Sequence, residues 1–117
     1  MITLITGGPG LGKTAHAVDI LQRDYAGKTI FSNIRELKTE HSKLPKVAEW
    51  TVSTINDQGT EEHKFSFPPG SIIVIDECQD FFRPRASGSK VPPYIQAFET
   101  HRHTGVDFIL ITQCVFH

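Results

Sequence analysis

Several features that would assign this chain to a specialised class are scarce in its 117 residues. The two cysteines, Cys78 and Cys114, lack the Cys-x-x-Cys spacing of zinc or redox sites, and we expect buried, reduced thiols. No apolar run approaches the roughly 20 residues of a bilayer span, so this chain is not expected to cross a membrane. The net charge of −1 does not indicate a bulk electrostatic attraction to nucleic acid or to an anionic membrane, and it leaves open a local basic patch.

We also do not expect a secretion signal, because the first apolar run spans only Ile2 to Ile5 before the glycine-rich segment ends it. We expect residues 1–117 to form a single domain, because 38% hydrophobic content suffices for one core.

Apolar runs and helical periodicities alternate along the chain, which is typical of an α/β fold with a mostly parallel sheet. The run Ile72–Ile75 is apolar on both faces, as in a strand covered by two helical layers. Residues 34–66 are mostly polar, but "EWTVSTI" and "HKFSF" around "NDQG" indicate a hairpin. Strands are predicted at 2–6, 28–33, 72–75 and 106–112, and helices at 13–24 and 93–103.

The first predicted strand and helix are joined by a segment that fits G-x-x-x-x-G-K-[ST], the P-loop or Walker A pattern. Glycines let backbone N–H groups approach a phosphate, and the helix N-terminus adds positive potential. We expect the lysine to reach the β- and γ-phosphates and the threonine hydroxyl to bind Mg²⁺. A glycine-rich turn that binds nothing is the alternative. The segment is Gly7, Gly8, Pro9, Gly10, Leu11, Gly12, Lys13 and Thr14.

Two acids follow the buried strand 72–75, in the position of a Walker B element. The carboxyl ends of parallel strands form the ligand edge of an open α/β sheet. Asp76 is therefore predicted to hold Mg²⁺, and Glu77 to act as general base on an attacking water. A solvated acid at a strand end is the alternative for Glu77.

Gln113 follows the strand 106–112, and its side chain is predicted to sense the γ-phosphate or to orient the water. A polar strand cap is the alternative. No Asn-Lys-x-Asp segment occurs, and residues 76–79 read "DECQ" rather than Asp-x-x-Gly, so ATP is favoured over GTP.

Multimeric ATPases often complete a site with an arginine from a neighbouring subunit. The candidates are Arg83, Arg85 and Arg102, each of which also fits an ordinary surface position. His101 and His103 are not expected to bind a metal, because positions i and i+2 of a helix point apart.

Three segments together resemble the N-terminal domain of the zonular occludens toxin (Zot) family, which includes the gene I assembly protein of filamentous phages. They are "MITLITGGPGLGKT", "SIIVIDECQDFFRPR" and "ETHRHTGVDFILITQ". The resemblance implies a P-loop NTPase three-layer sandwich in which strand 106–112 lies between the two motif strands, with Gln113 beside the γ-phosphate. It is weakest across residues 34–66.

The resemblance also implies an ATPase domain on the cytoplasmic face of the bacterial inner membrane, with roles in virion assembly and export. Phage assembly proteins and phage DNA are the implied partners, and the full-length protein is expected to self-associate. His117 lies just past the last predicted strand, so we expect a domain truncated at its C-terminus, soluble and cytoplasmic by itself.

The sequence thus predicts an ATP-binding, ATP-hydrolysing domain that powers filamentous phage export. A non-catalytic nucleotide-binding interaction module is the main alternative. A small-molecule kinase ranks last, since only "FRPR" offers arginines for a lid.

Overall fold

The computed structural model of the chain describes residues 2–7, 12–34, 37, 40–81, 91–99 and 105–112. Two α-helices, two short 3-10 helices and seven strands make up these parts of the chain. In chain order they are β1 (Ile2–Thr6), α1 (Lys13–Asp24), β2 (Ile30–Ser32), β3 (Ser42–Lys43), η1 (Val47–Glu49), β4 (Thr51–Ile55), β5 (Glu61–Phe65), β6 (Ile72–Ile75), η2 (Cys78–Asp80), α2 (Pro93–Glu99) and β7 (Asp107–Thr112).

The main sheet has five strands in the order β1-β7-β6-β2-β3, and its neighbouring strands pair in parallel. This arrangement confirms the predicted α/β fold with a mostly parallel sheet. Strand β7 lies between β1 and β6, as the resemblance implied. Thr6 pairs with Thr112 and Ile75 with Leu110, so the carboxyl ends of the three strands meet at one edge of the sheet.

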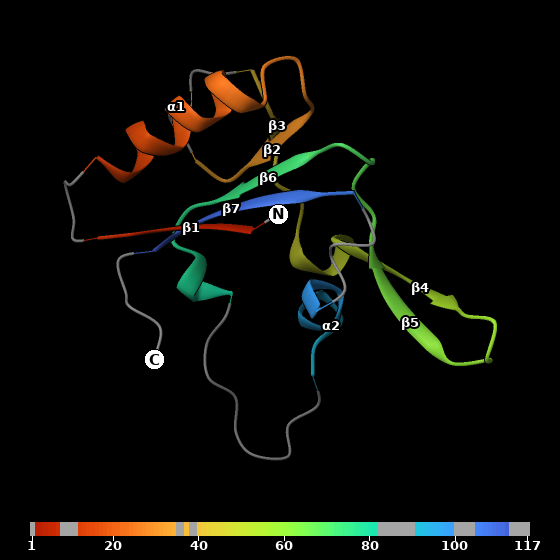
Figure 1. Cartoon of the computed structure of the whole chain (residues 1–117). Helices are drawn as coiled ribbons and strands as arrows, with labels where there is room; N and C mark the ends of the chain where they lie inside the picture. The colour runs from red at the N-terminus through yellow and green to blue at the C-terminus, as the bar shows by residue number, and fades with distance from the viewer. Residues whose placement is uncertain are drawn as a thin grey trace.

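The central strand β6 explains how the layers form. Its four residues are fully buried, and successive side chains of a strand point to opposite faces. Ile72 and Val74 pack in the cluster that contains α1, whereas Ile73 and Ile75 pack in the cluster that contains α2. Figure 1 shows α1 on one side of the sheet and α2 on the other. The run therefore sits between two layers, as predicted.

Helix α1 covers its face of the sheet through Ala17, Ile20 and Leu21, which are buried at helical spacing. At the far end of the helix, the Tyr25 hydroxyl donates a hydrogen bond to Asp107 Oδ2 over 2.9 Å. Burial and this bond raise the pKa of Tyr25 to about 12. The end of α1 is thereby tied to the beginning of β7.

The opposite face is covered by an aromatic layer that includes the predicted hairpin. Strands β4 and β5 pair in antiparallel register and project away from the sheet (Figure 1). Trp50, at the base of the hairpin, is fully buried, with ring centroids 5.2 Å from Phe81 and 5.5 Å from Tyr94. The polar segment 34–66 thus contributes Trp50 and Phe65 to the second core.

Some boundaries differ from the sequence predictions. Strand β2 is shorter than 28–33, and the two-residue strand β3 beside it was not predicted. Helix α2 is described over Pro93–Glu99, and the rest of the predicted helix lies outside the described residues. Cys78 is a buried free thiol, as expected, whereas Cys114 lies outside the described part. None of the described helices is long and apolar enough to cross a bilayer.

Candidate functional site

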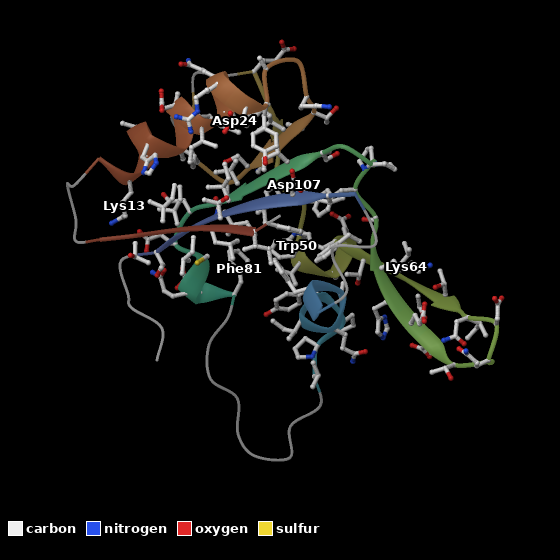
Figure 2. The ribbon with its side chains drawn as sticks, in the orientation of Figure 1. Lys13, Asp24, Trp50, Lys64, Phe81 and Asp107 are labelled. Atoms are coloured by element: carbon white, nitrogen blue, oxygen red, sulfur yellow. The ribbon has the colours of Figure 1, made fainter. Side chains whose placement is uncertain are left out.

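The P-loop begins at the end of β1 and leads into α1. Gly7 and Gly12 bracket the loop, and residues 8–11 (Gly8, Pro9, Gly10 and Leu11) lie outside the described part of the chain. The Lys13 ammonium donates a hydrogen bond to the Gly7 carbonyl over 2.9 Å. This bond joins the first residue of α1 to the residue that follows β1. Figure 2 shows Lys13 at the beginning of α1.

Gly12 occupies the N-cap of α1 in the left-handed region, with φ 74° and ψ 23°. A Cβ there would meet no atom within 4 Å, so the backbone conformation, and not crowding, favours glycine. The N-cap residue has no side chain to cap this helix end, and the first turn carries no acid. The positive end of the helix dipole therefore favours a ligand of negative charge here.

Asp76 is held at the end of β6 by a side chain from the neighbouring strand. Asn33 follows β2, and its Oδ1 accepts a hydrogen bond from the Asp76 N–H over 2.7 Å. Its Nδ2 donates to the Asp76 carbonyl over 2.9 Å. The Asn33 side chain thus extends the contact between β2 and β6 beyond the last paired residues, Ser32 and Val74, to Asp76.

Glu77 turns the chain from β6 into η2. Its backbone is left-handed, with φ 54° and ψ 45°, which is uncommon for a residue with a Cβ. Its N–H donates to Asp76 Oδ1 over 2.9 Å, which orients the neighbouring carboxylate. Its own carboxylate accepts a hydrogen bond from Gln79 Nε2. Both predicted acids are therefore held by specific contacts.

The two acids and Thr14 line one hollow of about 780 Å³ at the carboxyl edge of the sheet. Figure 2 shows Phe81, which also lines it, on the side of the sheet away from α1. The lining residues are Thr14, Asn33, Ile34, Asp76, Glu77, Asp80 and Phe81. A second hollow, of about 530 Å³, lies where α1 ends and β2 begins, and it contains none of the predicted site residues.

The donor set fits a magnesium ion that arrives with a nucleotide. Mg²⁺ is usually bound by one or two protein oxygens together with phosphate oxygens and waters. Thr14 and Asp76, whose side chains carry such oxygens, both line the hollow. Among the described residues, no group of three His, Cys, Asp or Glu side chains could form an all-protein metal cage.

Cys78 lies directly after the acids but does not belong to the reactive surface. Burial and the nearby Asp76 raise the pKa of its thiol to about 11. The thiol is therefore protonated at neutral pH and packs in the core beneath the site.

Five predicted residues of the nucleotide site lie outside the described residues: Gly8, Pro9, Gly10, Leu11 and Gln113. The arginine candidates Arg83, Arg85 and Arg102 lie there too, as do His101 and His103. Their assignments stay predictions.

Five residues of the site were missed by the sequence analysis: Asn33, Ile34, Gln79, Asp80 and Phe81. The strand-end rule that selected Asp76 also applies to Asn33, because this residue ends the second predicted strand. Gln79 carries no such signal, since it lies within the short helix η2.

Comparisons with known proteins place these features in a family. The family described as Zonular occludens toxin (Zot) matches residues 1–116. A relative from Pseudomonas phage Pf3, "Putative assembly protein ORF301", is 34% identical over 97% of this chain and 36% of its own length. "Gene 1 protein" of Enterobacteria phage I2-2 is 32% identical over 96% of this chain and 34% of its own length.

A solved structure has the same fold. The crystal structure of the N-terminal domain of zonular occludens toxin from Neisseria meningitidis matches with a TM-score of 0.69 and 31% identity, over 96% of this chain and 65% of that one. The chain spans about a third of the length of the two phage relatives. With the P-loop sequence pattern, the two acids after β6 and strand β7 between β1 and β6, the chain belongs to the zonular occludens toxin family.

Proposed function

We propose that this chain is an ATP-binding and ATP-hydrolysing domain that powers the assembly and export of a filamentous phage. The observation that carries the proposal is the convergence of Thr14, Asp76 and Glu77 on one hollow, reached from separate parts of the sequence. The names of the phage relatives, an assembly protein and a gene 1 protein, support the biological role.

In this proposal the P-loop and Lys13 bind the phosphates. The ammonium, which now contacts the Gly7 carbonyl, exchanges that contact for the β- and γ-phosphate oxygens. Thr14 and Asp76 hold Mg²⁺, which neutralises charge on the phosphates when it is bound. The positive end of the α1 dipole adds to the attraction at the same place.

Glu77 is the proposed general base. Its carboxylate accepts a proton from a water whose oxygen attacks the γ-phosphorus, while the bond from that phosphorus to the bridging oxygen breaks and ADP leaves. Gln113 is proposed to orient this water or to sense the γ-phosphate. An arginine from a neighbouring copy, with Arg83, Arg85 and Arg102 as candidates, would complete the site.

The proposed setting follows from the family. We propose that the full-length protein self-associates at the cytoplasmic face of the host inner membrane and acts with phage assembly proteins on phage DNA.

The test compares Glu77→Gln with a matched change, Glu49→Gln, at an exposed glutamate of η1. We expect Glu77→Gln to bind Mg-ATP like the wild type and to lose about 10²–10⁴-fold in phosphate release. Glu49→Gln should keep both. Rates are measured over a range of protein concentrations, because an assembled site gives turnover that rises with concentration. Unchanged turnover in Glu77→Gln would refute the assignment.

A second candidate is a nucleotide-binding interaction module without turnover. It is favoured by the projecting hairpin, where Val52 is 49% and Ile55 is 67% exposed. Both side chains are accessible to a partner protein. Saturable ATP binding without phosphate release at any protein concentration would select this candidate.

A further inference from the structure

Gln79 connects the end of β7 to the proposed general base. Its Oε1 accepts a hydrogen bond from the Thr112 hydroxyl over 2.7 Å. Its Nε2 donates to Glu77 Oε2. Thr112 is the last residue of β7 and is 1% exposed, so one end of this chain of bonds is anchored in the sheet.

The chemistry of the three groups gives the bonds a direction. A carboxylate accepts hydrogen bonds and an amide carries its donor and acceptor on opposite atoms. The Thr112 hydroxyl donates to the amide oxygen, which turns the amide nitrogen toward Glu77. Reversing the amide would face its oxygen to the carboxylate and repel it. The acceptor-only Glu77 carboxylate therefore fixes which amide atom faces it. The Thr112 hydroxyl anchors the other end of the Gln79 side chain, which in turn orients Glu77.

The left-handed backbone of Glu77 requires contacts that hold this residue in place. A left-handed conformation at a residue with a Cβ persists only where surrounding contacts hold it. The short helix η2 that follows has three residues, too few to fix the carboxylate by its own regularity. The bond from Gln79 is a contact that reaches the carboxylate itself.

We propose that Gln79 is a positioning residue for Glu77, through which the end of β7 controls where the general base points. This inference rests on the proposed ATPase function. The last residue of β7 directly precedes Gln113, the proposed γ-phosphate sensor, so a shift of this strand end on nucleotide binding would be passed to Glu77 through the Gln79 amide.

The kinetic test uses paired variants. Thr112→Val removes the hydroxyl at nearly constant volume, Thr112→Ser keeps it, and Gln79→Leu removes both bonds. Displacing a catalytic group by about 1 Å costs about 10²-fold in rate, so we expect Gln79→Leu and Thr112→Val to lower kcat by about 10- to 100-fold. KM should stay within about twofold, because no phosphate contact is changed.

The controls separate positioning from stability. Gln96→Leu removes the bond from Gln96 to the Val91 carbonyl in α2, away from the site, and should leave kcat unchanged. Thr112→Ser should behave like the wild type. The double variant Gln79→Leu/Thr112→Val should be no slower than Gln79→Leu alone, because both changes break one chain of bonds. Additive losses, or equal kcat in Thr112→Ser and Thr112→Val, would overturn the proposal.

A second arm needs no turnover. In NMR spectra of the nucleotide-free chain, the side-chain amide signals of Gln79 should shift in Thr112→Val and in Glu77→Ala, and stay in place in Thr112→Ser. Gln79 side-chain amide signals that shift in neither Thr112→Val nor Glu77→Ala would refute the positioning role. Absence of turnover in the folded wild type would instead refute the proposed ATPase function, while the NMR arm still decides whether Gln79 holds Glu77.

Discussion

The contact between Asn33 and Asp76 allows a quantitative prediction about the metal side of the site. Asn33→Ala removes two hydrogen bonds to the backbone of Asp76, of 2.7 and 2.9 Å. A hydrogen bond contributes about 0.5–1.5 kcal/mol net, and Asn33 is exposed, so water replaces part of the loss. We expect the free energy of unfolding to fall by about 1–2 kcal/mol.

The effect on ligand binding should exceed what stability alone explains. Residues that orient a metal ligand typically change affinity by about 10- to 100-fold when they are mutated. We therefore expect Asn33→Ala to weaken Mg-ATP binding about tenfold, equivalent to about 1.4 kcal/mol. ATP without Mg²⁺ should show little difference between the two proteins, because Asp76 is proposed to act through the metal.

Asn56→Ala provides the matched control. Asn56 lies in the hairpin turn, where its side chain donates to Glu62 and accepts from the N–H groups of Gln58 and Thr60. This variant should lose at least as much stability and keep its Mg-ATP affinity. Stability is read from urea unfolding by fluorescence of the chain's one tryptophan, and affinity by calorimetry. Equal Mg-ATP affinity in Asn33→Ala and wild type would refute the reasoning.

Three further predictions concern the body of the domain. Trp50→Ala should lower the free energy of unfolding by about 3–5 kcal/mol, measured by circular dichroism in urea, because Trp50 is fully buried; a loss below about 1 kcal/mol would contradict the packing. In a Cys114→Ser background, Cys78 should resist alkylation at pH 8 in the folded state. The pKa of Cys78 is raised to about 11 from 9.0, so the folded state holds the thiol proton more tightly than the unfolded state. The free energy of unfolding should therefore fall as pH rises from 9 to 11, and Cys78→Ala should reduce this fall. Tyr25→Phe should cost about 1 kcal/mol at neutral pH by removing the bond to Asp107. Because the pKa of Tyr25 is raised to about 12 from 10.0, this variant should also lose less stability than wild type between pH 10 and 12.

The sequence predicted the elements whose local signals agree with their packing. Strand β1 and helix α1 flank a loop pattern with a specific geometric need, and β6 is apolar on both faces because both faces are covered. The hairpin followed from its turn residues, with Gly59 at φ 77° in the turn.

What the sequence did not predict depends on contacts between distant segments. Strand β3 consists of two exposed residues, Ser42 and Lys43, which become a strand only by pairing with β2. The full burial of Trp50 depends on contacts with the rings of Phe81, which directly follows η2, and Tyr94 of α2. Gln79 acquires a role because the strand order places Thr112 beside it.

Calorimetric titration of Mg-ATP into the chain, beside Lys13→Ala, tests the central claim most directly. The proposed site predicts saturable binding by the wild type that is lost in Lys13→Ala, with the same urea midpoint for both proteins and weaker binding of Mg-GTP than of Mg-ATP. A folded wild type that binds no nucleotide, or a Lys13→Ala variant that binds as tightly as wild type, would contradict it.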